Sequence, residues 1–348
     1  MKVFIALFVV LLTLTISGAQ ESAEQFCPSS TLFPDYCSCD EFDRSINCYL
    51  NKRKDGQVFD VKQSLKKVGD FVKSSGLPQQ YFDELLILCV SDAKPSVIFD
   101  ENSLGYLQFR KVTFDKCIVN KIHPNAFNSN HRSLEIFNLR NNVLEKEAIH
   151  NIFKAVIKLN ALRVLDISFN NIEKIPANAF KAQRRQENLT EIDLQSNAIT
   201  EIGDFAFADV SSLEFLYLDN NKILSIKGNT FAFQEKSSAR LLLSLNSNKL
   251  NTSSFEQSAF LSLQRPATLD MNGNEITILT ENIFKPFLFM AKRNVINIKG
   301  NPIECNEKNA WLVPYRTLFR YLLKLDVPHT VWSCLSPQSK QAAPKHGH

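Results

Sequence analysis

One pattern of apolar residues and asparagine recurs through this chain and constrains its fold more than any other feature. Its clearest copy runs from Leu162 to Phe180, with apolar residues at places one, four, six and eleven and Asn170 at place nine. The apolar residues at places four and six alternate with polar neighbours, as a short half-buried strand requires. The asparagine follows the strand, where its amide can satisfy backbone groups of the next turn. Each copy therefore predicts a strand followed by a turn.

The asparagine recurs at a nearly constant interval. Counted from Cys117, which occupies the same place, the intervals are 25, 28, 27, 24, 27, 26 and 27 residues. The column consists of Asn142, Asn170, Asn197, Asn221, Asn248, Asn274 and Asn301. This period and the pattern L-x-x-L-x-L-x-x-N-x-L, which permits cysteine for asparagine, are the signature of leucine-rich repeats. We expect an α/β solenoid, a right-handed leucine-rich repeat horseshoe with a parallel β-sheet on its concave face.

A second column consists of phenylalanines. They are Phe127, Phe180, Phe207, Phe231 and Phe284, with Phe260 close to the scheme. We expect these rings to stack into a spine inside the solenoid. Two copies depart from the pattern, with Glu147 in place of an aliphatic residue in one, and Arg240 and Ser253 at apolar places in another. These departures predict distortion of the convex side with intact strands.

The amino-terminal segment predicts secretion. Residues 1–19 carry one lysine, an apolar run from Val3 to Ile16 and a small-residue end, as a cleaved signal peptide does. An uncleaved anchor is the alternative, but the run is short for a membrane span. Because no second apolar run approaches membrane-spanning length, we expect no membrane anchor and an extracellular protein. Asn188 and Asn251 begin acceptor sequences for N-linked sugar.

Eight cysteines, an even number, suit an oxidising compartment. Cys89 and Cys117 are 28 residues apart, which is one repeat, and adjacent parallel strands lie about 5 Å apart. We therefore predict a Cys89–Cys117 disulfide, with two buried free thiols as the alternative. Four more cysteines crowd into 22 residues before the repeats, in the order C-x9-C-x-C-x8-C. Their spacing alone allows three pairings, and a zinc site is the competing interpretation.

The ends of the repeat array resemble the caps of extracellular leucine-rich repeat proteins. At the amino-terminal end, that resemblance implies the pairs Cys27–Cys39 and Cys37–Cys48. At the other end, N-P-x-x-C from Asn301 followed by Trp311-Leu312 resembles the carboxy-terminal cap, although Glu307 takes the place of a second cysteine. The bridge that remains is Cys305–Cys334, which closes a loop before a polar tail.

Within this class, three features resemble secreted arthropod proteins similar to the non-catalytic subunit of a shrimp luciferin monooxygenase: the long cysteine-bearing preface, the predicted helix before the first coil and the reduced carboxy-terminal cap. That likeness implies a role as the stabilising partner of a secreted enzyme.

A helix is predicted from apolar residues at helical spacing between Gln57 and Ser74, namely Val61, Leu65, Val68, Phe71 and Val72. A second apolar set at helical spacing consists of Leu318, Phe319, Leu322 and Leu323.

These observations divide the chain into six segments. We expect a signal peptide at 1–19, a cysteine-rich cap at 20–50, an irregular first coil with a helix at 51–81, repeats at 82–303, a carboxy-terminal cap at 304–335 and a disordered tail at 336–348.

Function should depend on the side chains that project from the concave face of the sheet, at places three, five and seven of each copy. The amino-terminal edge of this face is basic through Lys111, Lys116 and Arg140, whereas its middle combines acidic and aromatic residues. Exposed aromatic residues ringed by charge are common at protein interfaces. The predicted ligand-binding residues are Asp166, Phe169, Glu191, Asp193, Phe215, Tyr217 and Asp219. The alternative is that they are ordinary solvated strand residues.

Other chemistry finds little support in the sequence. It contains no G-x-S-x-G or H-E-x-x-H motif and no phosphate-binding glycine loop, so we predict no enzyme, cofactor or metal site. Asp166 and Asp193, which we expect on adjacent strands, form the one pair of carboxylates considered for acid–base catalysis or calcium binding. The net charge of +4 argues against nucleic acid. We expect a secreted protein that binds an extracellular protein or glycan; the alternatives are an accessory subunit of a secreted enzyme and a matrix structural protein.

Overall fold

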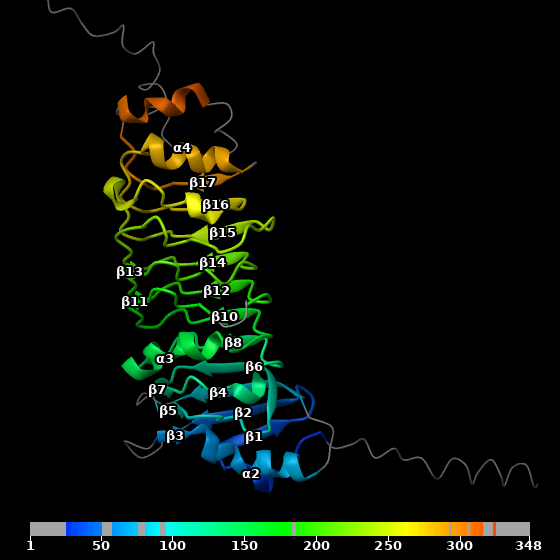
Figure 1. The fold of residues 1–348 in the computed structure, drawn as a ribbon. Coiled ribbons are helices and arrows are strands. Elements are labelled where there is room, and N and C mark those ends of the chain that lie inside the picture. The colour runs from blue at the N-terminus through cyan, green and yellow to red at the C-terminus, as the bar shows by residue number, and fades with distance from the viewer. Residues whose placement is uncertain are drawn as a thin grey trace, which may run out of the picture.

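The computed structural model describes residues 26–50, 58–75, 81–90, 95–182, 186–291, 294–304, 307–315 and 323–324. The described coils stack into a solenoid that begins near α2 (Val61–Ser74) and continues past α4 (Glu281–Met290), as Figure 1 shows. One face is a twelve-stranded sheet, counted over these residues, in which β1 and β2 are antiparallel and every later neighbour is parallel. The predicted solenoid with a parallel sheet is confirmed.

The strands of this concave sheet are short, as one strand per repeat requires. In spatial order they are β1 Cys37–Asp40, β2 Ser45–Leu50, β4 Tyr81–Cys89, β6 Gln108–Asp115, β8 Ile136–Asn138, β10 Val164–Asp166, β12 Glu191–Asp193, β14 Phe215–Tyr217, β15 Leu241–Ser244, β16 Ala267–Asp270, β17 Val295–Asn297 and β18 Leu323–Lys324. The sheet thus begins within the cysteine-rich preface. Leu323, expected in a helix, is instead in β18 and pairs with Ile296, so that prediction was wrong for this residue. The other members of that apolar set lie outside the described residues.

Within the described part of the chain, two small parallel sheets line the opposite side of the solenoid. The first has the order β3-β5-β7-β9 and the second pairs β11 with β13. Their strands are β3 Val58–Asp60, β5 Ser96–Phe99, β7 Ile118–Ile122, β9 Val143–Leu144, β11 Lys174–Ile175 and β13 Glu201–Ile202. Short 3-10 turns complete the coils, at η1 Ser30–Leu32, η2 Asn128–Asn130, η3 Thr252–Ser254, η4 Leu261–Leu263 and η5 Glu307–Tyr315.

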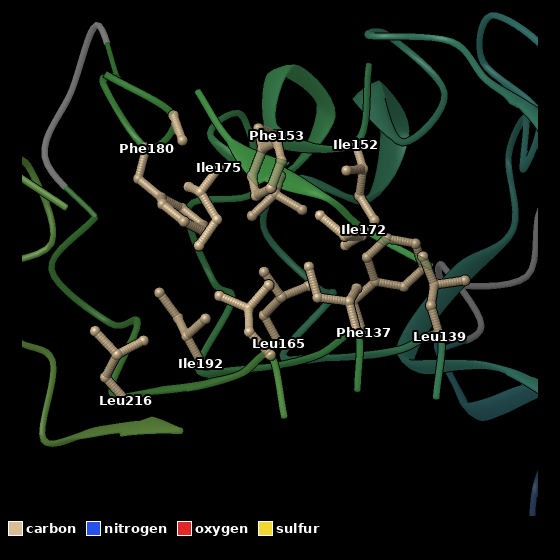
Figure 2. Close-up of a cluster of buried hydrophobic side chains, with 14 of the residues drawn as sticks. Phe137, Leu139, Ile152, Phe153, Leu165, Ile172, Ile175, Phe180, Ile192 and Leu216 are labelled. Atoms are coloured by element: carbon tan, nitrogen blue, oxygen red, sulfur yellow. The ribbon is translucent and has the colours of Figure 1, made fainter. Parts of the chain in front are cut away.

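The break between these two sheets coincides with α3 (Lys146–Val156), a helix that the sequence analysis did not predict. Glu147, the residue that breaks the repeat pattern, lies in its exposed first turn. Ile152 and Phe153 of α3 are buried and point toward Ile172 and Ile175 of the next coil (Figure 2). The predicted distortion of the convex side is therefore a helix that supplies core residues, while the strand of this coil stays intact.

The other predicted helix is confirmed in α2, which begins after Asp60, whose Oδ1 accepts a hydrogen bond from the Gln63 N–H at 3.1 Å. Its buried face contains four of the five expected residues, but Phe71 is 40% exposed. The second irregular repeat also behaves as expected. There Ser253 lies in the 3-10 turn η3, capped by Asn251, and β15 is intact.

The asparagine column forms a hydrogen-bond ladder. The Nδ2 of Asn197 donates to the carbonyl of its own coil at Leu194 and to that of the preceding coil at Ile167, at 3.1 and 3.0 Å. Its Oδ1 accepts from Ile172 N at 3.0 Å. The same two kinds of donor bond are made by Asn142, Asn170, Asn221, Asn248, Asn274 and Asn301. Buried amides thus join successive coils, which satisfies backbone groups that the turns leave unpaired.

The phenylalanine column is buried but does not form one continuous stack. Phe180 and Phe207 stack at 5.6 Å between ring centroids, and Phe207 and Phe231 at 6.1 Å. On the amino-terminal side of Phe180 the next ring is Phe153 from α3, edge-on at 5.4 Å. The remaining members of the column pack against other rings, since Phe127 contacts Phe99 and Phe137, and Phe284 contacts Phe255 and Phe260.

Three predicted disulfides are confirmed, and they connect adjacent chain segments at the amino-terminal end. The bridges are Cys27–Cys39, Cys37–Cys48 and Cys89–Cys117, with Cα–Cα distances of 5.7, 4.0 and 5.1 Å. The third links the last residue of β4 to Cys117, which follows the end of β6, as the one-repeat separation predicted. The expected Cys305–Cys334 bridge, the signal peptide and the tail lie outside the described residues.

Candidate binding surface on the concave sheet

The predicted ligand-binding residues do come together, because the strands pair in register. Asp166 aligns with Asp193 and Asp193 with Tyr217, while Glu191 aligns with Phe215. We call the set Asp166, Glu191, Asp193, Phe215, Tyr217 and Asp219 the mid-sheet patch. It spans β10, β12 and β14 in the centre of the solenoid (Figure 1).

The aromatic pair of this patch is preformed. The rings of Phe215 and Tyr217 lie 6.2 Å apart, centroid to centroid, with 14° between their planes. Phe215 is 38% exposed, a large value for a phenylalanine on a strand. Burial raises the pKa of Tyr217, and the carboxylates of Glu191, Asp193 and Asp219 raise it further. The Tyr217 hydroxyl therefore stays protonated and can donate a hydrogen bond at neutral pH.

Carboxylates of the patch also accept hydrogen bonds from neighbouring residues. They are therefore not simply solvated, as the alternative interpretation expected. Asp166 Oδ1 accepts from Ser168 N at 2.9 Å, and Asp219 Oδ1 accepts from the Ser244 hydroxyl at 2.6 Å and from Asn246 N at 3.1 Å. Their Oδ2 atoms and the Glu191 carboxylate have no hydrogen-bond or ion-pair partner within the described residues. These acceptors are available to a ligand.

Asp193 differs from its neighbours because its carboxylate is nearly inaccessible. The residue is 8% exposed, and its two oxygens accept from Gln195 N at 2.9 Å and Gln195 Nε2 at 2.7 Å. Burial, with a smaller contribution from the Asp166 charge, raises the pKa of Asp193 to about 6. The hydrogen bonds from Gln195 and the Arg140 charge oppose this shift. The patch therefore holds a desolvated negative charge at neutral pH.

Phe169 lies apart from that patch, beside the amino-terminal part of the sheet. The Arg140 guanidinium carbon is 4.5 Å from its ring centroid. Phe169 is 43% exposed and has a φ of 54°, in the left-handed region that residues before the asparagine column adopt. In other coils this place holds a small or polar residue, such as Asn141, Ser196 or Asn220. The structure thus brings Phe169 to Arg140, and not to the Phe215–Tyr217 pair.

The amino-terminal edge is less basic than the sequence suggested. The Lys111 ammonium lies 3.1 Å from a Glu84 carboxylate oxygen on the neighbouring strand, which neutralises it. Glu84 also accepts from the Thr113 hydroxyl at 2.5 Å. Glu84 projects from the concave face of β4, a strand for which no outward-facing residues were predicted from the sequence.

Two leucines of β4 were not predicted from the sequence to face outward. Leu86 and Leu88 alternate with the buried Leu85 and Ile87, so they leave the sheet on its concave side, and both are half-buried. With Phe169 and Arg140 they line a pocket of about 630 Å³. The signal was the continuous apolar run at 85–88, since a strand with one solvated face should alternate.

The two candidate glycosylation sites are exposed. Asn188 Nδ2 donates to Asn160 O at 2.8 Å, and Asn251 Oδ1 accepts from Ser253 N at 2.9 Å. Sugar attachment at either remains a prediction. Among the described residues there is no group of three or more potential metal ligands and no helix long and apolar enough to cross a membrane.

Comparison with known proteins agrees with the repeat fold. Residues 187–236 and 161–182 match two sequence models, both described as leucine-rich repeat. The fold is a leucine-rich repeat solenoid. The chain is similar to podocan of Mus musculus, at 25% identity over 281 residues that make up 78% of this chain and 41% of podocan. It is also similar to lumican of Gallus gallus, at 31% identity over 115 residues, 32% of this chain and 31% of lumican.

The match therefore spans less than half the length of these relatives. Among solved structures, the leucine-rich repeat domain of APL1B aligns with a TM-score of 0.43 at 18% identity, covering 61% of this chain and 54% of that one. With its disulfide-bonded amino-terminal region, this solenoid is similar to small leucine-rich proteoglycans.

Proposed function

We propose that this chain is an extracellular binding protein whose concave sheet recognises a basic segment of a partner protein. The observation that carries the proposal is the Phe215–Tyr217 pair, two stacked and accessible rings bordered by carboxylates on three neighbouring strands. Because Leu216 between them fills the core, both side chains point outward, and nothing in the packing of the solenoid requires aromatic residues at these outward places.

The chemistry of the patch favours a cation. A lysine or arginine over an aromatic face gains about 0.5–1 kcal/mol where solvent has access and about 2 kcal/mol when desolvated. The Glu191 carboxylate and the free Oδ2 atoms of Asp166 and Asp219 add acceptors for its N–H groups. Charge-assisted hydrogen bonds of this kind are the stronger ones at interfaces.

Asp193 strengthens the same conclusion. Burial of a carboxylate costs stability unless a positive charge compensates it. The Arg140 charge compensates Asp193 in part, yet its pKa remains raised to about 6. A partner cation on the patch would supply the missing charge, and strongly perturbed groups concentrate at functional sites.

The setting supports an extracellular role. Three disulfides suit an oxidising compartment. Podocan and lumican, to which the chain is similar, are secreted matrix proteins. The proposed signal peptide at 1–19 would direct the chain there.

The test is capture of the partner from the native extracellular fluid on immobilised, disulfide-intact protein. Wild type should retain a partner that Phe215→Ala/Tyr217→Ala binds well over tenfold more weakly, with an unchanged far-ultraviolet spectrum. Glu191→Gln should weaken binding at low salt and much less at high salt, because added ions screen the lost charge.

Phe205→Asn is the matched control. Phe205 is 41% exposed but lies after β13 on the other side of the solenoid, in a left-handed conformation that Asn178 adopts one coil earlier. Equal capture by wild type and the double variant would reject the proposal. Loss of capture after enzymatic removal of the partner's glycans would instead identify a glycan ligand.

Two other roles from the sequence make different predictions for the same experiment. An accessory subunit would retain a stoichiometric enzyme through a surface that the double variant leaves intact. A matrix structural protein would stay in an insoluble fraction. The accessory role rests on the resemblance to arthropod proteins alone, whereas the binding role has the geometry of the patch in its support.

A further inference from the structure

The outward face of β4 breaks the alternation expected of this sheet. A strand with one solvated face carries polar residues there, and the outward residues of β10 and β12 include Asp166, Glu191 and Asp193. On β4 Leu86 takes the place of Asp166 and Asp193, and Leu88 takes the place that Asp115 holds in the next coil. Two neighbouring outward leucines on a concave face indicate a surface that another apolar group covers.

The apolar surface extends to both sides of these leucines. Leu88 aligns with Tyr49 on β2, which is 45% exposed. On the other side the pocket of about 630 Å³ reaches across β6 and β8 to the Phe169 ring. A cavity of this size is within the range that ligand sites occupy.

The charges around the pocket are already matched. Its lining carries one charge of each sign, Asp115 and Arg140, and Asp115 Oδ1 also accepts from Asn141 Nδ2 at 3.0 Å. The Arg140 guanidinium carbon lies 4.5 Å from the Phe169 ring centroid, so this cation already interacts with a ring of the pocket lining. The occupant that fits best is an uncharged apolar side chain.

The pocket and the mid-sheet patch belong to one continuous sheet. From Thr113 in the pocket to Tyr217 in the patch there are four strand steps, through Asn138, Asp166 and Asp193. At about 4.8 Å a step, the two sites are about 19 Å apart. An extended chain, at about 3.3 Å per residue, covers that distance in about six residues.

We infer that the concave face binds an extended peptide segment of the partner, with an apolar side chain in the Leu86–Leu88 pocket and a lysine or arginine about five or six residues away on the mid-sheet patch. This inference rests on the proposed function for the basic residue and adds the apolar anchor, the spacing and the direction across the strands. The acidic patch and the neutral, apolar pocket together are complementary to such a bipartite segment.

A phage-displayed library of random dodecapeptides, selected on the immobilised full chain with its disulfides intact, tests the inference. Wild type should enrich peptides that carry leucine, methionine or phenylalanine five or six positions from lysine or arginine. A synthetic peptide of the enriched sequence should bind Leu86→Ser/Leu88→Ser at least tenfold more weakly than wild type.

Two variants separate binding from folding. Phe169→Asn opens the pocket wall with a residue that the same place holds in other coils, so it should fold normally and bind the peptide about three- to tenfold more weakly. Leu224→Ser is the matched control, because Leu224 is a 57% exposed leucine outside the concave strands. It should bind the peptide as wild type does.

The outcomes distinguish this inference from the proposed function. Enrichment of basic residues without a fixed apolar partner would overturn the bipartite site and leave the patch in place. Peptides that depend on Leu86 and Leu88 but bind Phe215→Ala/Tyr217→Ala normally would overturn the proposed function and the spacing with it. Selection of no common sequence would overturn the inference as well.

Discussion

The two sides of the same strands carry different information. Inward from β10, β12 and β14 are Leu165, Ile192 and Leu216, which are fully buried and lie in register in one core (Figure 2). Outward from the same strands are the mid-sheet patch residues, which change from acid to aromatic within two coils. The inward set is chemically uniform because every coil must fill the same space, whereas the outward set is free to vary.

Stability and recognition are therefore largely separable in this solenoid, with exceptions that can be measured. Repeat proteins depend on contacts between neighbouring coils, so an inward residue affects two interfaces at once. An outward residue affects folding only through its hydrogen bonds. Asp193 and the asparagine ladder lie between these extremes.

The largest stability effect should come from the core. Phe180→Ala removes a fully buried ring that contacts Phe153 at 5.4 Å and Phe207 at 5.6 Å. The free energy of unfolding should fall by about 3–5 kcal/mol. Chemical denaturation of the disulfide-intact protein measures this loss. A loss below 1 kcal/mol would show that α3 and the neighbouring coil repack freely, and would remove the distinction between the two sides.

A smaller effect, of opposite sign, should come from Asp193. Its pKa of about 6 in the folded chain exceeds the ordinary 3.8, so the folded state binds this proton more tightly than the unfolded state. The free energy of unfolding therefore falls as the pH rises from about 4 to about 6, and the loss persists at neutral pH. Asp193→Asn, which can still accept from Gln195 N, should raise stability by about 1–3 kcal/mol at pH 7.5.

The pH dependence supplies the control for this variant. At pH 4, where the wild-type carboxyl is protonated, Asp193→Asn and wild type should have equal stability, while binding of a basic partner at pH 7.5 should be weaker in the variant. A constant stability difference between pH 4 and pH 7.5 would contradict the assigned cause.

The smallest effect should distinguish two members of the asparagine ladder. Asn197 Oδ1 accepts from Ile172 N, but Asn170 Oδ1 is buried without a hydrogen-bond partner among the described residues, because Asn171 Oδ1 takes Leu144 N at 2.9 Å. Asn197→Ala should therefore cost about 1 kcal/mol more than Asn170→Ala. Equal losses in parallel denaturation curves would show that the acceptor bond contributes nothing.

Much of the fold could be predicted because the repeat constrains it so tightly. Asn170 and its equivalents fix the end of each strand, and register follows from their spacing. The Cys89–Cys117 bridge followed from the same argument. Phe71 was misplaced because helical spacing gives the apolar side of α2 but not the extent of its burial.

Features that depend on neighbouring coils could not be predicted from the repeat pattern. The α3 helix has a helical spacing in Ala148, Ile152 and Ala155, but the broken repeat pattern predicted only a distortion of the convex side there. The burial of Asp193 could not be predicted from one strand. Leu86 and Leu88 were overlooked because β4 lacks the full repeat motif, so its outward places were not assigned.

Binding and stability, measured in the same variants, show most directly whether recognition lies on the outward side of the sheet. Once a partner is captured, isothermal titration should give an affinity more than tenfold weaker for Phe215→Ala/Tyr217→Ala than for wild type. The free energy of unfolding of this double variant should stay within about 1 kcal/mol of the wild-type value. The control variant Phe205→Asn should bind the partner as wild type does. Unchanged affinity of the double variant would contradict the assignment of recognition to the outward side of the sheet.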